Sequence, residues 1–222
     1  AQFEYAFDTI GNRTSAMEGA APSAPSGYAA NNLNQYTQRT VPGLIFVTGE
    51  ASTGATVSVR LNTNNAMLAS RHGEYFWKTV GVDNASALFG TTNLRVRAIA
   101  VQGTSSLVRV EIRSALVPAN TEIFTYDPDG DLTSDSLWTN VYNGENRLIS
   151  AESRSGVPDS QKLRLEFTYD HSGRRTTKKV LSGYSAGAYG TTNLTTSIWS
   201  GWSFIGEIRN SGSASNWFTY GI

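Results

Sequence analysis

The side chains that could do chemistry in this sequence are few, since the chain has two histidines and no cysteine. Its densest group of carboxylates is Asp127-Pro128-Asp129-Gly130-Asp131, and oxygen ligands of this kind suit Ca²⁺. The glycine stands at the fourth place of this segment and no Glu follows at the twelfth, so the segment departs from an EF-hand loop. We therefore predict no metal site, and Asp127, Asp129 and Asp131 remain the best calcium candidates.

The two histidines are the other candidates for chemistry. His171 directly follows Asp170, and an imidazole beside a carboxylate could act in acid–base catalysis. Its position is a variable one in a tight turn, however, which favours an exposed turn residue. His72 precedes Gly73 and has no evident partner. Because H-E-x-x-H and G-x-S-x-G motifs are also missing, we predict no catalytic residue, no cofactor and no enzymatic activity.

Asp170 belongs to a ten-residue stretch, Phe167 to Thr176, whose pattern indicates a strand, a tight turn and a second strand. An Asp carboxylate at the start of a turn can accept a backbone N–H two residues later. Gly173 stands three residues after Asp170, where glycine can take a positive φ without a steric penalty. Phe167 and Tyr169 are two residues apart and therefore share one face of a strand. The elements that must position the candidate residues are thus β-hairpins.

The same pattern recurs along the chain, in residues 5–14, 28–37, 124–133 and 141–148 and, most diverged, in 198–205. Asn replaces Asp or Gly in some copies, because Asn also makes such turns and tolerates the left-handed region. The predicted turn residues are Asp8, Gly11, Asn31, Asn34, Asp127, Gly130, Asn143, Asn146, Asp170 and Gly173. The predicted repeat aromatics are Tyr5, Phe7, Tyr28, Phe124, Tyr126, Tyr142, Phe167, Tyr169 and Trp199. Internal repetition of this kind predicts an array of similar units.

The pattern aromatic-x-Tyr-Asp-x-x-Gly-Arg/Asn-x-Thr resembles the YD repeat of Rhs proteins, of the C component of Tc toxins, of wall-associated proteins and of teneurins. The resemblance covers residues 1–40 and 120–222, and Trp217 to Gly221 is similar to the start of the Rhs-associated core. It implies a spiralling β-sheet that winds into a hollow shell around a C-terminal toxin or effector. In that family self-cleavage belongs to the core downstream of the repeats, so the resemblance implies no catalytic residue here.

Between residues 41 and 119 the pattern is interrupted by short alternating strands, at 44–49, 56–61, 75–80, 94–100 and 107–112. Arginines occupy the outward positions of the last two strands, a signature of half-buried strands. We predict an inserted β-sandwich, Ig-like or carbohydrate-binding-like, between hairpin segments 1–40 and 120–222. The alternative is a run of diverged strands that continues the repeat sheet.

The expected fold class is all-β and antiparallel, with almost no helix, because no stretch sustains a 3.6-residue period. The composition is rich in aromatic residues and Gly, with 16% charged residues, which suits a pleated sheet and its turns. Residues 182–196 are rich in Gly, Ser, Thr and Asn and predict a long flexible hairpin loop. Asn84-Ala85-Ser86 matches a glycosylation sequon, which we interpret as a coincidence of composition.

Lys plus Arg equals Asp plus Glu, so the formal net charge is zero and gives no reason to expect nucleic acid as a partner. No apolar run approaches the length of a membrane span. We expect a secreted or cell-surface bacterial protein, and the sequence is interpreted as a fragment or the ordered part of a longer chain. The expected partners are neighbouring repeats of the parent chain, like subunits through edge strands, or a surface glycan or protein.

Three functions follow from these observations. The first is a structural one, a segment of a shell that encapsulates a toxin or effector. The second is an extracellular adhesin or self-assembling surface fibre, because unpaired edge strands invite the addition of further chains. The third is a glycan-binding module in residues 41–118.

Overall fold

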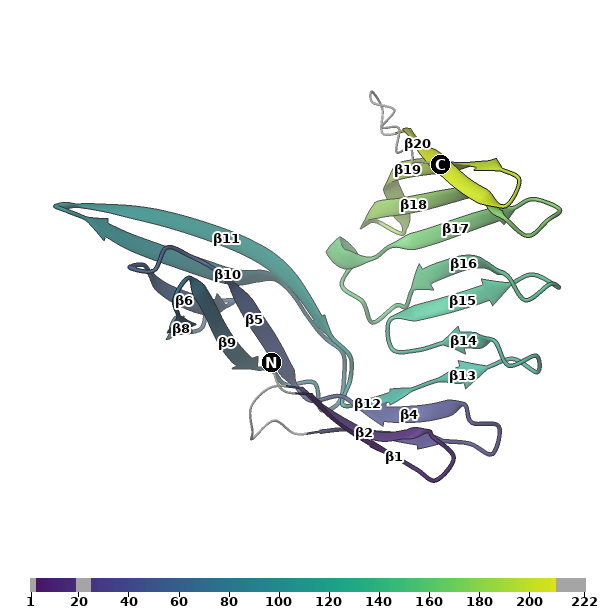
Figure 1. Cartoon of the computed structure of the whole chain (residues 1–222), viewed down its shortest axis with the longest axis horizontal. Helices are drawn as coiled ribbons and strands as arrows, with labels where there is room; N and C mark the ends of the chain where they lie inside the picture. Colours follow the sequence, from purple (N-terminus) through teal and green to yellow (C-terminus); the bar gives the residue numbers. More distant parts are fainter. Residues whose placement is uncertain (1–2, 19–24, 211–222) are drawn as a thin grey trace. The chain divides into compact units, whose positions relative to one another are not determined.

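The computed structural model describes residues 3–18 and 25–210, and the chain divides into two compact units, residues 1–122 and 123–222 (Figure 1). Both units consist of antiparallel strands, which confirms the predicted all-β class. Helix in the described residues is confined to one 3₁₀ turn, η1 (Asp159–Gln161), and none of it is long and apolar enough to cross a membrane. The predicted core-like motif from Trp217 to Gly221 lies outside the described residues.

The first sheet of the first unit is built from the two N-terminal hairpins and one later strand, in the order β1-β2-β3-β4-β12. Its strands are β1 (Phe3–Phe7), β2 (Arg13–Glu18), β3 (Ser26–Ala30), β4 (Tyr36–Thr40) and β12 (Thr121–Ile123). The hairpins β1–β2 and β3–β4 are the predicted copies 5–14 and 28–37. Their side chains are exposed or half-buried, so hydrogen bonds and contacts between neighbouring hairpins hold this sheet more than a core does.

Residues 44–117 form two facing sheets, β5-β9-β8 and β11-β10-β6-β7. Their strands are β5 (Leu44–Glu50), β6 (Thr56–Leu61), β7 (Met67–Leu68), β8 (Ser70–His72), β9 (Tyr75–Gly81), β10 (Phe89–Gln102) and β11 (Ser105–Val117). Val47 and Phe76 of one sheet pack with Val57, Val59 and Leu94 of the other in one buried core. These strands therefore form a β-sandwich, two sheets packed around one core.

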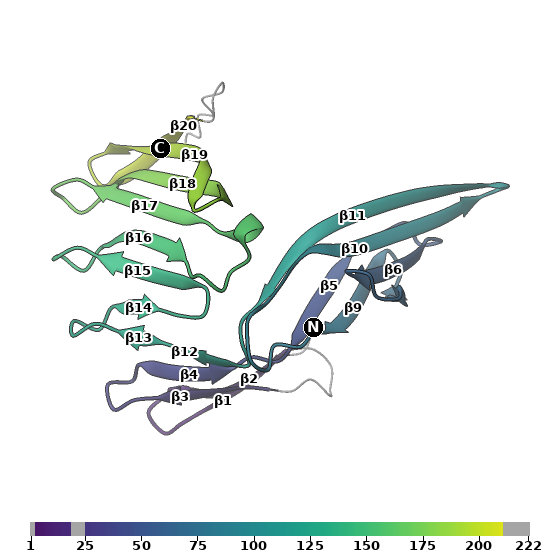
Figure 2. The same cartoon turned by 180° about the vertical axis from the view of Figure 1, so that it is seen from behind.

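The long hairpin β10–β11 extends past the shorter strands of its sheet as a two-stranded ribbon (Figure 2). Successive side chains of β10 alternate between the two faces of the sheet. Val96 and Ala98 pack against the core, while Arg95 and Arg97 point to the opposite face. Beyond the core the ribbon is exposed, with Val101 71% and Leu107 58% accessible.

The chain enters and leaves the sandwich through one hydrogen-bonded neck. The amide N–H of Val41 donates to the carbonyl of Asn120, and the N–H of Asn120 donates to the carbonyl of Asn84. The Asn84 side chain donates to the carbonyls of Val41 and Pro118 at 3.0 and 2.8 Å. Asn84 is only 4% exposed, so its sequon is inaccessible in the folded protein.

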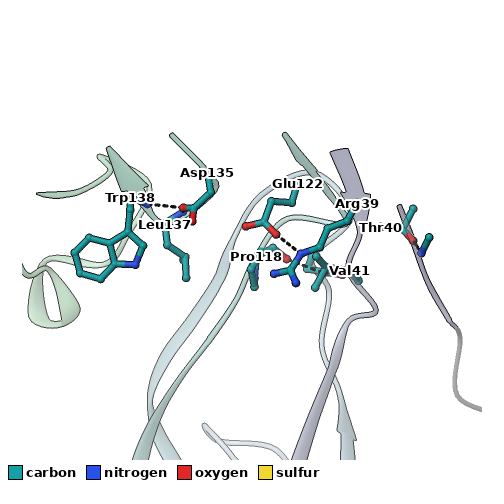
Figure 3. A network of polar contacts seen from close by, with 10 residues as sticks. Arg39, Thr40, Val41, Pro118, Glu122, Asp135, Leu137 and Trp138 are labelled. Carbon is teal, nitrogen blue, oxygen red and sulfur yellow. Dashed lines mark hydrogen bonds and ion pairs between the residues drawn. The ribbon is translucent and has the colours of Figure 1, made fainter. Parts of the chain in front are cut away.

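Beside this neck, Arg39 of β4 forms an ion pair with Glu122 of β12 (Figure 3). Glu122 is 2% exposed and its carboxylate is almost fully removed from water. Burial lowers the pKa of Arg39, but the hydrogen bond and the charge of Glu122 outweigh it and leave the pKa raised. Removing Arg39 would leave the carboxylate of Glu122 buried and unpaired, and leaving a charge buried without its partner typically costs about 3–5 kcal/mol.

The second unit is a single sheet of eight strands, each paired with the next along the chain. The strands are β13 (Thr125–Tyr126), β14 (Leu132–Ser134), β15 (Trp138–Tyr142), β16 (Leu148–Ser153), β17 (Arg164–Tyr169), β18 (Arg175–Ser185), β19 (Ala188–Ser200) and β20 (Ser203–Asn210). Among its described residues, Ala151 and Val157 are the only buried hydrophobic residues. The sheet therefore has no second layer of its own within the described part of this unit.

The prediction of a flexible loop over residues 182–196 is wrong. These residues belong to β18 and β19, which keep one register up to a tight turn at Ala186 and Gly187, with only Gly183 and Gly190 left out of the paired residues. Both turn residues have positive φ, 50° and 86°, as a two-residue type I′ turn requires. Threonines, whose branched side chains favour strands, and an edge-to-face pair of Tyr184 and Tyr189 at 4.9 Å outweigh the glycines.

Candidate functional site: the repeated hairpin turns

Each predicted Asp or Asn turn is held by the same four hydrogen bonds, and the turn between β17 and β18 shows them. The N–H of Asp170 donates to the carbonyl of Arg174, and the N–H of Gly173 donates to the carbonyl of Asp170, both at 3.0 Å. The side-chain Oδ1 of Asp170 accepts the N–H of Ser172 at 2.9 Å and that of Arg174 at 3.0 Å. One carboxylate oxygen thus satisfies two backbone donors inside the turn.

The same bonds occur in the other four turns. The two side-chain bonds measure 3.0 and 2.8 Å at Asp8, 2.9 and 3.0 Å at Asn31, 3.1 and 2.9 Å at Asp127, and 3.0 and 3.0 Å at Asn143. The two backbone bonds are also present in each turn, at 2.9 to 3.2 Å. The amide oxygen of Asn and one carboxylate oxygen of Asp therefore accept the same two backbone hydrogen bonds.

The fourth position of each turn has a positive φ. The values are 92° at Gly11, 61° at Asn34, 90° at Gly130, 56° at Asn146 and 79° at Gly173. The strand that follows the turn is bulged in all five copies: the two residues before the Asp or Asn are consecutive, whereas their partners on the following strand are two residues apart. A type I turn followed by a left-handed residue and a bulge is a common way to close a hairpin, and it explains why Gly and Asn alternate here.

The electrostatics of these turns follow from their hydrogen bonds. The hydrogen bond from Arg174, reinforced by backbone donors, lowers the pKa of Asp170 despite partial desolvation. Desolvation raises the pKa of Asp8, but the hydrogen bonds from Asn12, Ile10 and Gly11 have the larger combined effect, so the pKa is lowered. Asp131 differs, because desolvation and the charges of Asp127 and Asp129 raise its pKa.

The candidate carboxylates Asp127 and Asp170 accept hydrogen bonds within their own turns. The carboxylate of Asp127 is engaged by the N–H groups of Asp129 and Asp131. Asp127, Asp129 and Asp131 are not arranged to hold a metal ion, and neither is any other group of three acidic or histidine side chains among the described residues. Asp170 is bonded to Ser172 and Arg174, so its carboxylate serves the turn and not His171.

The aromatic residue just before the turn joins one hairpin to the preceding one. The hydroxyl of Tyr142 donates to the carbonyl of Leu132 at 3.2 Å, and that of Tyr169 donates to the carbonyl of Leu148 at 2.8 Å. Both acceptors lie at the same place, five residues after the Asp or Asn of the preceding copy. We call these bonds the aromatic staples.

The diverged copy at 198–205 keeps the staple and loses the turn. The indole N–H of Trp199 donates to the carbonyl of Arg175 at 3.0 Å, and Arg175 lies five residues after Asp170. Its hairpin closes through a two-residue loop, because Ser200 pairs with Ser203. Trp199 also packs edge-to-face on Phe204 at 5.4 Å. The staple is therefore separable from the Asp or Asn turn.

Arginines that follow the turns cover several of the other predicted aromatics. Arg13 lies over the rings of Tyr5 and Tyr28 at 5.0 and 5.5 Å, and Arg175 lies 5.7 Å from the ring of Phe167. Such contacts add cation–π attraction between neighbouring strands. The remaining predicted aromatics are in less specific positions: Phe7 is 58% exposed, and Phe124 and Tyr126 are half-buried.

The arginine contacts and the neck residue Asn84 were not predicted from the sequence. A usable signal existed for the arginines, since Arg13, Arg147, Arg174 and Arg175 all lie four or five residues after a turn Asp or Asn. Arg147, for example, lies over Tyr169 of the next hairpin at 5.3 Å. Asn84 gave no such signal, because its partners are 34 and 43 residues away.

The turns, the aromatic staples and the arginines together can hold the hairpins in a continuous sheet. The turn oxygens are occupied by backbone donors, and the staples and arginines tie one hairpin to the next. No family model matches the chain, and no curated protein matches it. Among solved structures, the chain is similar to the crystal structure of TcdB2-TccC3-TEV, with 12% sequence identity and a TM-score of 0.23. The match covers 98% of this chain and 12% of that chain.

Proposed function

We propose that this chain is a structural segment of a larger secreted or surface-exposed bacterial protein, in which repeated hairpins form part of a β-wall around a C-terminal toxin or effector. The observation that carries the proposal is the turn whose four hydrogen bonds repeat in five copies. The aromatic staples add a bond from one copy to the preceding one. Units that contact mainly their neighbours make extended sheets that grow by repetition.

The second unit consists of a single sheet layer, which also supports a role in a wall. Its eight-stranded sheet has two buried hydrophobic residues among those described, so its stability comes from strand pairing and contacts along the sheet. Such a sheet suits a partition between two spaces better than a compact globule. In this proposal the chain performs no catalytic step.

Electron microscopy of the natural full-length protein tests the proposal. Closed hollow particles with density inside them are expected. Solid particles without a cavity, or long polymers, would overturn it.

Self-association through β11 is a second candidate, favoured by the pattern of that strand. β11 is the last strand of its sheet, and its outer edge pairs with no described strand. If two copies paired antiparallel about Val110, Arg109 would face Glu111 of the other copy and Val108 would face Ile112. Val108 and Ile112 are 50% and 55% exposed, so the edge carries self-complementary charge and apolar surface.

Sedimentation of charge-swapped chains separates this candidate from the wall. Arg109→Glu would place like charges opposite each other and is expected to abolish pairing. The double variant Arg109→Glu with Glu111→Arg restores opposite charges and should restore pairing. A monomeric wild-type chain at all concentrations would exclude self-association and leave the wall proposal unaffected.

A further inference from the structure

Three arginines gather on the outward face of the four-stranded sheet of the sandwich. Arg60 of β6 lies directly opposite Arg95 of β10, and Arg97 lies two residues further along β10, opposite Ser58. The neighbouring residues of both strands point into the core, so alternation places all three arginines on the outer side. We call this surface the arginine face; its strands β6 and β10 are seen in Figures 1 and 2.

The arginine face has no acidic counterpart. Its four strands β6, β7, β10 and β11 contain a single acidic residue, Glu111. Glu111 lies opposite Val96, which packs against the core, so it points away from the arginine face. It forms ion pairs with Arg109 and Arg113 at 2.6 and 3.2 Å. Arg60, Arg95 and Arg97 form no ion pair within the described residues.

Like charges directly opposite each other on a sheet are destabilising. The sandwich nevertheless holds Arg60 opposite Arg95, both half-buried, and the Nε atoms of both are screened from solvent without a hydrogen-bond partner. Together with Arg97 and Ser58 they line a shallow pocket of about 280 Å³. A bound anion would relieve the repulsion and use guanidinium groups that the protein leaves unpaired.

We propose that the arginine face binds an anionic glycan through a sulfate or phosphate ester seated in this pocket. Guanidinium groups present parallel N–H donors that match the oxygens of such esters. The Ser58 hydroxyl lies in the same pocket and can hydrogen-bond a sugar hydroxyl. The site lies in the sandwich and would operate whether or not the hairpins form a wall.

Two other polyanions fit the face less well. Single-stranded nucleic acid binds through bases stacked on aromatic side chains, and the outward positions around the pocket carry no aromatic residue: they are Thr56, Ser58, Leu68, Ile99, Val108, Val110 and Ile112. A membrane surface is flat, whereas these arginines line a recess that a single projecting ester group can enter. A sulfate or phosphate ester that projects from a glycan chain fits this recess better than either of them.

Binding of the whole chain to dextran sulfate, with neutral dextran as the reference polymer, tests the proposal by calorimetry. Arg95→Gln is expected to weaken binding to dextran sulfate by about tenfold. Arg109→Gln removes an equal charge from the opposite side of the sheet and is the matched control, expected to leave binding unchanged. Neutral dextran should not bind.

A second measurement keeps the test independent of folding. Because Arg95→Gln removes a repulsion, its thermal midpoint in the absence of polymer should be equal to or above that of the wild type. If the variant fails to fold, Arg97→Gln, at an exposed position, replaces it with the same expectation. Equal loss of binding in Arg95→Gln and Arg109→Gln would overturn the proposal. So would binding to anionic phospholipid vesicles or single-stranded DNA without binding to dextran sulfate.

Discussion

At the scale of single residues, each turn position has a narrow chemical requirement that more than one residue type can meet. The fourth position needs a residue that tolerates positive φ, and the chain uses both Gly173 and Asn146 there. The first position needs a side-chain acceptor, and the chain uses both Asp170 and Asn143. Substitution between the types that the repeats already use should therefore be mild, and other substitutions should not.

Gly173→Asn should change the free energy of unfolding by no more than about 0.5 kcal/mol, because Asn34 and Asn146 hold the same conformation. Gly173→Val should cost about 1–2 kcal/mol, since a β-branched residue is strained at a φ of 79°. Urea unfolding measures both. Gly144 lies in an equivalent hairpin, does not have a positive φ and has open space around it, so Gly144→Val is the control and should be milder. Equal costs at the two glycines would contradict the argument.

Asp170→Asn should make the stability of the second unit less sensitive to acid. The pKa of Asp170 is lowered in the folded protein from 3.8, chiefly by Arg174, so its ionised form is bound more tightly in the folded state. That stabilisation is fully present above pH 3.8 and is lost as the pH falls through the lower folded value. The wild type should be more stable than the variant at pH 6, and the difference should shrink below pH 3.8. A difference that stays constant in urea unfolding between pH 6 and pH 3 would refute this account.

At the scale of elements, the hairpins are joined by bonds that the turn pattern alone does not contain. The aromatic staple links the residue before one turn to the strand after the preceding turn, over 10 residues at Tyr142 and 21 residues at Tyr169. The two hydroxyl staples are neutral hydrogen bonds to half-buried backbone groups, which are the kind that contribute measurably to stability.

Tyr169→Phe should lower the stability of the second unit by about 1 kcal/mol, because it removes only the hydroxyl that donates to the Leu148 carbonyl. Tyr75→Phe is the matched control, since Tyr75 is 54% exposed on the sandwich, and it should have little effect. Fluorescence-detected urea unfolding compares the two. A Tyr169→Phe chain as stable as the control would show that packing of the ring alone joins the hairpins.

The turns could be predicted from sequence because their hydrogen bonds join residues two to four apart, so a short sequence pattern contains all the residues that form the turn. The Asp or Asn of the repeated pattern stands at the first position of five such turns, and the alternating segments between residues 44 and 112 lie in the strands of two facing sheets. The staples and the Arg60–Arg95 pair required the register between strands, which depends on residues far apart in the chain. The segment 182–196 was misjudged because its glycines suggested a loop, whereas the chain reverses at Ala186 and Gly187 and the positive φ of Gly183 is accommodated within β18.

At the scale of the molecule, the two units have different sources of stability. The sandwich encloses a core in which Val57 and Val59 are 1% and 0% exposed. In the second unit the described buried hydrophobic residues are Ala151 and Val157, and each strand depends on its neighbours. An array of this kind opens from its ends, whereas a closed core opens as a whole.

Hydrogen exchange should therefore distinguish the units. The amides of Val57, Val59 and Leu94 are expected to exchange more slowly than the paired amides of β18 and β19, although both sets lie in continuous ladders. Protection within the second unit should fall from its middle strands toward β20, the last described strand. Mass spectrometry of peptides from a single labelled sample of the whole chain provides the comparison under identical conditions. Equal protection in the two units would mean that strand pairing alone sets local stability and that the sandwich core adds nothing to it.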